Sequence, residues 1–318
     1  MMTGTIASVN VSEDKGSKKR PVERAVLLTG LGISGDAHAG DRVRQVSLLA
    51  RESIDKMSAL GLSVGPGDFA ENLTCSGLDL TALPVGSRLE AGAADQLGNR
   101  VILQISQIGK VCHTPCQIGK QAGECIMPRE GVFAQVVRGG ELSLGDVIKP
   151  VSCLVGAVLT VSDRCAGGER EDGSGPVLQQ LLRNIGMDIA AYEVVPDEEE
   201  IISRQLAFLA DSCCVDVVLT TGGTGFSPRD VTPEATAGVV DRTAPGIAEA
   251  IRRAGAEFTP YACLSRGTVG LRGRTLIVNL PGSKKAVSEA ADFLAQVLPH
   301  ALKSLRGEAK DCGRAVQL

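Results

Sequence analysis

A glycine-rich stretch followed by an acid is the segment of this sequence best suited to chemistry, and residues 219–236 read LTTGGTGFSPRDVTPEAT. Its glycines allow positive φ angles and close backbone approach, and N–H groups exposed in such a loop attract anions. Asp230 lies just beyond and could hold a metal ion against a bound phosphate. Two interpretations are open: a phosphate-binding loop with a metal-binding aspartate, or a plain tight turn after a buried strand.

Two further segments with similar chemistry follow other predicted strands. Ser162, Asp163 and Arg164 precede the glycine-rich run GGEREDGSGP, and residues 279–283 read NLPGS. Because ligands of open α/β sheets bind beyond the carboxyl ends of the strands, we expect these segments to meet at one edge. Serine and threonine hydroxyls would complete the contacts to an anion. Asp163 and Arg164 could instead form only a local salt bridge.

Asp197 and Asp230 are the predicted metal-binding pair. Mg²⁺ is commonly held by one or two carboxylates together with substrate phosphates. Asp197 has an alternative role as the N-cap of a helix that opens at Glu198. The PGSKK segment around Gly282 lacks the residue order of a Walker A loop, which disfavours an ordinary P-loop kinase.

A cysteine-rich segment, QIGKVCHTPCQIGKQAGEC, is the second candidate for chemistry. It carries four potential metal ligands or nucleophiles, which are Cys112, His113, Cys116 and Cys125. Their spacing is not the paired CxxC pattern of structural zinc sites. Zinc binding, inert buried thiols and a reactive cysteine all remain open; Lys110, His113 and Lys120 would favour a reactive thiolate.

Composition limits the partners. A chain of 318 residues predicts two domains. The net charge of −4 and the 3% aromatic content argue against nucleic acid as a partner. The start MMTGTIASVN resembles no signal peptide, and no apolar run is long enough for a membrane span, so we expect a cytoplasmic protein without a membrane partner. The ten cysteines are then expected to be reduced thiols.

The residues up to about 150 predict a mostly β domain, a barrel or a sandwich, over residues 1–150. Short apolar runs alternate with turns, and they are TGTIASVNV, RAVLLTG, QVSLLA, SRLEAG and RVILQIS. Only residues 51–60 have a helical pattern. The lysine-rich piece SEDKGSKKR is interpreted as a solvated hairpin loop.

Residues 151–318 predict an α/β domain with three layers and a mostly parallel sheet. VGAVLTVS, AAYEVVP, VDVVLTTGG and TLIVNLPG are continuous apolar runs, typical of strands buried on both faces. One helix is predicted to start at Ser174 with Gly175 and Pro176 and to end before Gly186. A second has an apolar face from Val287 to Leu298.

Several motifs in this second half closely resemble the molybdopterin adenylyltransferase family. They are VLTVSDRCAGG, DGSGP, VVPDEEE, TTGGTGFSPRDVTPEAT, APGIAEAIR, LSRGTVGLRGRTLIVNLPGSKKAV and LPHALK, and they cover residues 154–306. The resemblance implies an α/β sandwich, usually a homotrimer. It also implies transfer of AMP from Mg-ATP to the terminal phosphate of molybdopterin, with release of pyrophosphate.

The resemblance also implies functional residues. The catalytic and metal-binding aspartates match Asp197 and Asp230, and two ligand-contacting loops match residues 221–225 and 279–283. With the first strand end, the predicted ligand-binding residues are Ser162, Asp163, Ser174, Gly175, Thr221, Gly222, Gly223, Thr224, Gly225, Asn279, Pro281, Gly282 and Ser283. The attacking oxygen would belong to the substrate, so no nucleophilic triad is needed.

The first half resembles the MOSC domain, named after the C-terminal part of molybdenum cofactor sulfurases. GISGDAHAG, RQVSLLARES, PGDFAENLT, LPVGSRLEAG, QIGKVCHTPC and CIMPREGVFAQV carry this resemblance, which covers residues 3–149. It implies a β-rich barrel that handles sulfur or the cofactor through a cysteine, without pyridoxal phosphate. Cys116 matches that cysteine, and Cys112 or Cys125 could share or replace its role. Arg44, His38 and Asp36 could contact an anionic cofactor, although Asp36 and His38 could equally be structural.

Both halves indicate molybdenum cofactor biosynthesis. The hypothesis is an enzyme whose second domain adenylylates molybdopterin and whose first domain binds or modifies the product or carries sulfur. Its substrates would be molybdopterin and Mg-ATP, with handover to a molybdenum insertion protein or a molybdoenzyme. The alternatives are a carrier or storage protein that binds molybdopterin without chemistry, and a transferase acting on another nucleotide. The pair Asp197 and Asp230 favours the enzyme, because a pure binding module has no need of metal-holding carboxylates.

Overall fold

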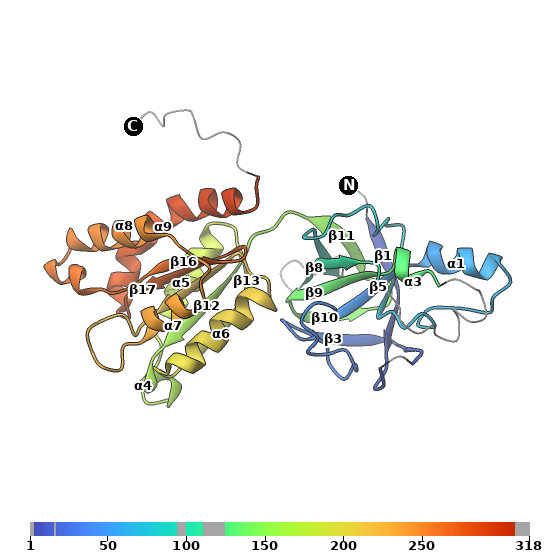
Figure 1. Ribbon diagram of the computed structural model, residues 1–318, viewed down its shortest axis with the longest axis horizontal. Coiled ribbons are helices and arrows are strands. Elements are labelled where there is room, and N and C mark those ends of the chain that lie inside the picture. Colours follow the sequence, from blue (N-terminus) through green and yellow to red (C-terminus); the bar gives the residue numbers. More distant parts are fainter. Residues whose placement is uncertain (1–2, 16, 94–99, 111–124, 309–318) are drawn as a thin grey trace. The chain divides into compact units, whose positions relative to one another are not determined.

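The chain divides into two compact units in a computed structural model that describes residues 3–15, 17–93, 100–110 and 125–308 (Figure 1). The units are Met1–Cys153 and Leu154–Leu318, and each has its own apolar core. The predicted two-domain organisation, β-rich and then α/β, is confirmed. Within the described part of the chain, no helix combines the length and apolarity that a membrane crossing requires.

The first unit contains a closed seven-stranded barrel. The strands of this unit, inside and outside the barrel, are β1 (Gly4–Val11), β2 (Arg20–Val22), β3 (Arg24–Leu28), β4 (Gly32–Ile33), β5 (Val46–Ala50), β6 (Leu73–Ser76), β7 (Arg88–Gly92), β8 (Val101–Ile108), β9 (Val132–Arg138), β10 (Gly140–Ser143) and β11 (Val147–Val151). Hydrogen bonds connect them in the order β11-β7-β8-β9-β5-β6-β1, and β1 pairs back with β11 to close the ring. β2 pairs with β1, while β10, β3 and β4 form a separate small sheet. Helices α1 (Arg51–Ala59) and α3 (Met127–Glu130) complete the described part of this unit.

The barrel strands and the small sheet share one apolar core. Along β3, Ala25 and Leu27 are buried while the residues between and around them are exposed, which is the period of two expected of a strand with one buried face. Leu48, Leu103 and Val136 from neighbouring strands fill the same core. The barrel strand β9 differs from β3, because its first six residues are all buried and both of its faces are therefore covered.

The lysine-rich segment between β1 and β2 is a hairpin loop, but it is not fully solvated. Lys19 is buried, with 1% of its side chain exposed, and its Nζ lies 2.5 Å from Oδ2 of Asp36. The prediction of a solvated loop is therefore wrong at Lys19. The reason is a tertiary contact: a buried ammonium is tolerated when a carboxylate from elsewhere in the chain neutralises it.

The second unit is built on one six-stranded sheet. Its strands are β12 (Val155–Val161), β13 (Asp188–Val195), β14 (Val217–Thr221), β15 (Arg242–Thr243), β16 (Val269–Arg272) and β17 (Thr275–Leu280). Its helices are α4 (Asp163–Ala166), α5 (Gly175–Asn184), α6 (Glu199–Asp211), α7 (Thr232–Val239), α8 (Pro245–Ala256), α9 (Lys284–Leu305) and the 3₁₀ turn η1 (Pro260–Leu264). The sheet order is β13-β12-β14-β17-β16-β15. The first four strands are parallel, β16 is antiparallel to β17, and β15 is antiparallel to β16.

Burial on both faces is confirmed for three of the four predicted parallel strands and wrong for β13, which lies at the edge of the sheet and is mostly half-buried. Every residue of β12, β14 and β17 is buried, so helices or loops must cover both faces of this part of the sheet. Leu182 of α5 and Leu294 of α9 pack in one core with Val158 of β12. Parallel pairing places the carboxyl ends of β12, β14 and β17 at the same edge.

Candidate functional site

The carboxyl ends of β12, β14 and β17 border one cavity of about 390 Å³. Many predicted site residues line it together, namely Ser162, Ser174, Asp197, Thr221, Gly222, Gly223, Asp230, Gly282 and Ser283. They come from segments far apart in the sequence, and the parallel sheet brings them to one place. Their roles toward a ligand remain predictions.

The glycine-rich loop after β14 packs too tightly for side chains. Gly222 and Gly223 have φ angles of 102° and 60°, in the left-handed region that favours glycine. A Cβ on Gly222 would lie 2.1 Å from the carbonyl oxygen of Val161, and one on Gly223 would lie 2.4 Å from Oγ1 of Thr232. The interpretation as a tight turn after a buried strand is therefore sufficient to explain why glycines occupy positions 222 and 223. The same packing leaves backbone, rather than bulky side chains, at the cavity wall.

Arg266 holds this loop from outside the cavity, and sequence analysis did not single it out. Its Nε donates to the carbonyl oxygen of Gly225 at 2.7 Å, and Nη2 donates to the carbonyl oxygen of Asp230. Nη1 pairs with Glu234. A guanidinium presents its donors in a rigid plane, so Arg266 ties the glycine loop to the segment that carries Asp230. The sequence feature that could have identified Arg266 is its place in LSRGTVG, the start of one of the motifs that carry the family resemblance.

Asp197 and Asp230 form the acidic part of the cavity. Asp197 is not a helix cap: the N-cap of α6 is Glu198, and Asp197 Oδ2 accepts the N–H of Asp163 at 2.8 Å. Asp230 Oδ2 accepts the N–H of Ser227 at 2.8 Å. Burial raises the pKa of Asp197, and the negative charges of Asp163 and Asp230 raise it further. A bound cation would relieve this repulsion.

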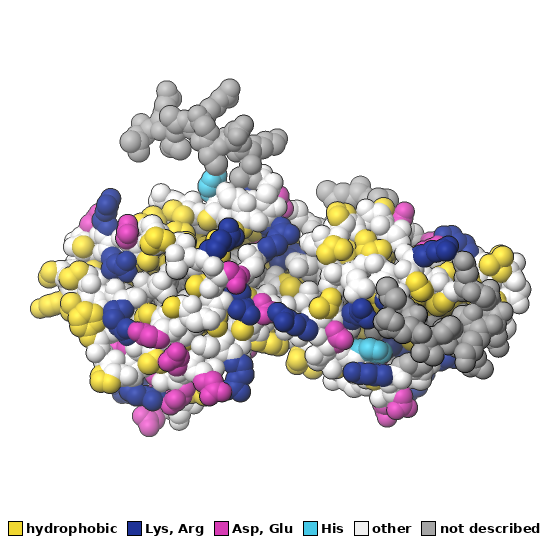
Figure 2. Space-filling model, viewed as in Figure 1, with side chains coloured by type: hydrophobic (Ala, Val, Ile, Leu, Met, Phe, Trp, Pro, Cys, Tyr) yellow, Lys and Arg dark blue, Asp and Glu magenta, His cyan; other side chains and the backbone are white. Residues whose placement is uncertain are grey.

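Asp163 forms an ion pair beside the cavity rather than lining it. Among the described residues, Asp163 pairs with Arg229, at 2.9 Å between Nη2 and Oδ1, and not with the adjacent Arg164. The same guanidinium lies 3.0 Å from Glu198. The salt-bridge alternative was therefore right about Asp163 but wrong about its partner. These side chains are exposed, and Figure 2 shows acidic groups gathered at the end of the second unit where α4 lies.

Asp172 is a cavity residue that sequence analysis did not single out. Its Oδ2 accepts the hydroxyls of Thr160 at 2.6 Å and Tyr192 at 2.7 Å, and its Oδ1 accepts the N–H groups of Ser174 and Gly175 at 2.9 and 3.0 Å. Burial disfavours its charge, but the hydrogen bonds outweigh burial and lower the pKa of Asp172. Asp172 therefore joins β12, β13 and the start of α5. The DGSG sequence was its only local signal.

Other predicted ligand-binding residues do not line this cavity; they are Asp163, Gly175, Thr224, Gly225, Asn279 and Pro281. Asn279 is buried, with 3% of its surface exposed. Its Nδ2 donates to the hydroxyls of Thr220 and Thr236 at 3.0 and 2.9 Å, and its Oδ1 accepts the N–H of Thr268. Asn279 thus connects β17 to its neighbours, and direct ligand contact by it stays a prediction.

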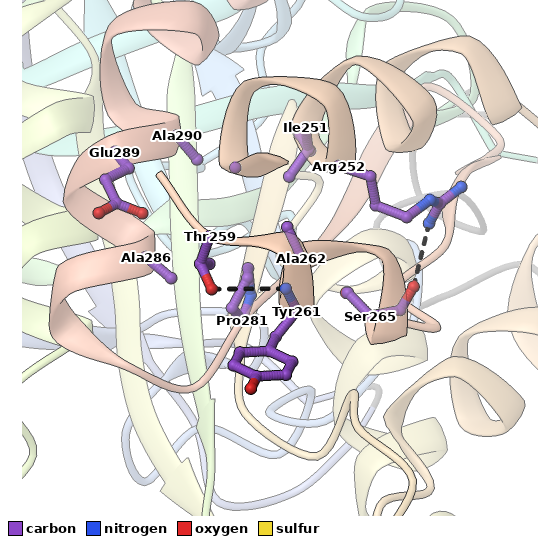
Figure 3. A pocket seen from close by; sticks show the side chains of 11 residues that line it. Ile251, Arg252, Thr259, Tyr261, Ala262, Ser265, Pro281, Ala286, Glu289 and Ala290 are labelled. Carbon is purple, nitrogen blue, oxygen red and sulfur yellow. Dashed lines mark hydrogen bonds between the residues drawn. The ribbon is translucent and has the colours of Figure 1, made fainter. Parts of the chain in front are cut away.

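Pro281 lines a second cavity, of about 170 Å³ (Figure 3). Most of its walls are apolar side chains, such as Ile251 of α8 and Ala290 of α9. Glu289 of α9 adds a carboxylate, whose Oε1 lies 3.8 Å from Nζ of Lys285. Since Gly282 and Ser283 line the first cavity, residues 281–283 contribute to both.

The acidic pair suits a cation that is completed by a ligand. Among the described residues, no group of three or more His, Cys, Asp or Glu side chains could hold a metal ion by itself. Asp197 and Asp230 offer two carboxylates at one cavity. Mg²⁺ commonly takes one or two carboxylates and fills its other positions with water and phosphate oxygens, so this pair fits that ion.

The reactive segment predicted in the first unit falls mostly outside the described residues. Cys112, His113, Cys116 and Lys120 all lie there, so zinc binding and cysteine reactivity stay predictions. Cys125 is described and half-buried. Lys110, two residues before Cys112, and Arg44, from a distant part of the sequence, lie over the ring of Phe133, at 6.0 and 5.5 Å from its centre.

Asp36 lies in a buried polar cluster, and the partly exposed His38 borders it. The carboxylate of Asp36 pairs with Lys19 and accepts the Nδ2 of Asn72 at 3.0 Å, the N–H of Ser12 at 3.1 Å and the N–H of His38 at 3.0 Å. Burial opposes its ionisation, yet the hydrogen bonds from His38 and Lys19 hold the pKa of Asp36 well below its usual range. The structure thus supports the structural alternative for Asp36.

Both halves match known protein families. The family described as "probable molybdopterin binding domain" matches residues 157–300, and the MOSC domain matches residues 35–149. The predicted order of the two domains is confirmed.

Individual proteins are similar over about half of the chain. A molybdopterin adenylyltransferase of Helicobacter pylori strain J99 is 38% identical over 47% of this chain and 86% of its own length. The molybdenum cofactor synthesis protein cinnamon of Drosophila melanogaster is 47% identical over 46% of this chain, but the match spans only 24% of that protein. The solved structure of MoaB from Thermus thermophilus is 47% identical, covers 48% of this chain and 97% of that one, and gives a TM-score of 0.47.

Proposed function

The chain belongs to the molybdopterin adenylyltransferase family, and we propose that its second unit, residues 151–318, transfers AMP from Mg-ATP to the terminal phosphate of molybdopterin. The observation that carries this proposal is the meeting of Asp197, Asp230 and the glycine loop at one cavity. Paired carboxylates beside a phosphate-sized backbone cradle suit a metal-bound polyphosphate. The preceding unit, residues 1–150, adds a MOSC domain to this activity.

The reaction requires alignment rather than a protein nucleophile. An oxygen of the molybdopterin phosphate attacks the α-phosphorus of ATP, the bond from that phosphorus to the bridging oxygen breaks, and pyrophosphate leaves with the electron pair. The protein then has to hold the two phosphates in line and balance their charge. Gly222 and Gly223 let the backbone face the substrate, while Ser162 and Ser174 offer hydroxyls at the same cavity.

Asp197 and Asp230 are the proposed holders of Mg²⁺. When bound there, the ion would supply Lewis-acid neutralisation of the phosphate oxygens. Arg266 does not line the cavity, but it positions Asp230, because its Nη2 donates to the carbonyl oxygen of that residue. Asp172 keeps the start of α5 in place beside them.

The second cavity is the proposed position of the organic ring of molybdopterin. Its mostly apolar walls would shield a flat ring from water, and the carboxylate of Glu289 could accept hydrogen bonds from ring N–H groups. Pro281 borders this cavity, whereas Gly282 and Ser283 border the first one. The turn at residues 281–283 would then contact both the ring and the phosphate of one ligand.

The MOSC domain is proposed to bind or modify the resulting cofactor, or to carry sulfur, through Cys116. The support is the family match and two cations, Arg44 and Lys110, which lie over the same ring of Phe133 and would favour an anion there. A search for a persulfide or cofactor adduct on Cys116, in protein isolated without reducing agent, tests this part. The proposal also includes three layers in the second unit. It further includes a homotrimer in the cytoplasm and handover of the product to a molybdenum insertion protein or a molybdoenzyme.

The decisive experiment is pyrophosphate release from Mg-ATP and molybdopterin, with Asp230→Asn beside the wild type. We expect release that depends on molybdopterin and falls by about 10²–10³-fold in the variant, because one group that stabilises transition-state charge is lost. Glu200→Gln is the matched control, since Glu200 is exposed and does not line the cavity. Binding of molybdopterin without any release of pyrophosphate would favour the carrier or storage alternative. Release of pyrophosphate in the absence of molybdopterin would favour a transferase that acts on another nucleotide.

A further inference from the structure

A third cavity adjoins the first one in the second unit. It measures about 450 Å³ and shares the wall segment from Glu171 to Gly173 with the first cavity. Its remaining walls include Gln180 of α5 and Lys284, the first residue of α9. A ligand longer than the first cavity could therefore extend past this shared wall.

Lys284 lies directly at the shared wall. A Cβ on Gly173 would lie 3.9 Å from Cβ and 3.7 Å from Cδ of Lys284, so the lysine stem passes over this glycine. Ser283 Oγ accepts the N–H of Ala286 at 3.1 Å, which sets the first turn of α9 and the direction in which Lys284 leaves it. Within the described part of the chain no ion pair of Lys284 is found, whereas Lys285 lies 3.8 Å from Glu289.

The proposed substrates require positive charge at this place. Pyrophosphate gains negative charge as it leaves, and cationic groups that face this developing charge accelerate phosphoryl transfer. Among the described residues lining the first cavity, Arg170 is the only Lys or Arg, against four acidic residues, Glu171, Asp172, Asp197 and Asp230. Glu171 lines the third cavity too and would repel a phosphate there unless a cation offset it.

We propose that Lys284 binds the leaving pyrophosphate, with the β- and γ-phosphates in the third cavity. Its ammonium would neutralise the charge that collects on pyrophosphate as the bond from the α-phosphorus to the bridging oxygen breaks. This inference rests on the adenylyl transfer proposed above. It adds a group separate from the pair Asp197 and Asp230 and gives the third cavity a ligand.

Binding of magnesium pyrophosphate and of AMP to the full chain, measured by titration calorimetry, tests the proposal. We expect Lys284→Ala to weaken pyrophosphate binding about tenfold or more, the usual effect of losing a charged hydrogen bond. AMP binding should change by less than about twofold. Lys284→Arg should retain most of the pyrophosphate affinity, and Lys285→Ala, the matched control, should change neither ligand.

The outcomes separate this proposal from the proposed function. Unchanged pyrophosphate binding in Lys284→Ala would overturn the role of Lys284. An equal loss of AMP and pyrophosphate binding would also overturn it and would place the nucleoside in the third cavity. Lys284-dependent pyrophosphate binding in a protein that releases none from ATP would support the anion site while the proposed adenylyl transfer fails.

Discussion

Asp36 in the first unit and Asp197 in the second are both turn aspartates, yet their surroundings are opposite. Asp36 is fully buried and is surrounded by donors, including the ammonium of Lys19. Asp197 is half-buried, borders a cavity and faces the like charges of Asp163 and Asp230. A carboxylate with donors on both oxygens stabilises the fold, whereas one held near other carboxylates is available to a cation.

Asp172 shows that position alone does not decide between these roles. It lines the cavity like Asp197, but donors occupy both of its oxygens as in Asp36. We therefore interpret Asp172 as a residue that positions Ser174 and Gly175, and not as a metal ligand.

The strongest test applies one substitution to both aspartates. Asp36→Asn should destabilise the first unit by about 3–5 kcal/mol, because the buried ammonium of Lys19 loses its carboxylate. Asp197→Asn should cost little or no stability, since it removes repulsion, but should lower pyrophosphate release by about 10²-fold or more. Hydrogen exchange in each unit and turnover of the same samples measure both effects.

The double substitution of Lys19 and Asp36 is the control for this test. Lys19→Met added to Asp36→Asn removes the unpaired ammonium, while the amide oxygen introduced at position 36 still accepts from neighbouring donors, so the double variant should recover much of the stability lost in Asp36→Asn. The comparison would be broken if Asp36→Asn left exchange in the first unit unchanged, or if Asp197→Asn unfolded the second unit.

Acid titration should act on the two aspartates with opposite signs. The folded-state pKa of Asp36 lies below the unfolded one, so its stabilisation is present above the unfolded pKa of about 4 and is lost as the pH falls through the folded value. The folded-state pKa of Asp197 is raised above the unfolded one. Its contribution to the stability of the second unit is therefore present below the unfolded pKa of about 4 and is lost as the pH rises through the folded value.

Mg²⁺ should compete with this protonation. In the second unit, stabilisation by Mg-ATP should grow as the pH rises from about 4 and Asp197 ionises. Thermal unfolding with and without Mg-ATP across this range measures it, and Asp197→Asn should flatten the dependence. Stabilisation that is independent of pH in the wild type would argue against Asp197 as a ligand.

The smallest expected effect concerns the hydroxyl that Tyr192 donates to Asp172. Tyr192→Phe should destabilise the second unit by about 1 kcal/mol, because the carboxylate retains its other donors. Turnover should change less than about twofold. In the wild type, burial and the bond to Asp172 raise the pKa of Tyr192 to about 12, so its ultraviolet titration should shift downward in Asp172→Asn. A large loss of turnover in Tyr192→Phe would place Tyr192 closer to the chemistry.

The local sequence pattern predicted most of the second unit's framework. Continuous apolar runs identified the parallel strands, and parallel pairing then brought Asp197, Asp230 and residues 221–223 to one cavity. Strand identity depends on the composition of neighbouring residues, and the edge at which strands end follows from the sheet type. In the first unit, short apolar runs between turns predicted the barrel strands β1, β5, β7 and β8, but not β6, β9 and β11.

The partners of charged side chains were decided only by the tertiary structure. Lys19 is neutralised by Asp36, Asp163 pairs with Arg229 rather than Arg164, and Arg266 reaches back to the loop after β14. These contacts join residues 17, 66 and 41 positions apart. Composition and periodicity describe which residues are buried and in what element, but a hydrogen bond or ion pair depends on where folding places two distant side chains. By itself, therefore, the sequence determined the elements and the chemical character of their ends, and the fold decided which carboxylates have donors and which are left for a ligand.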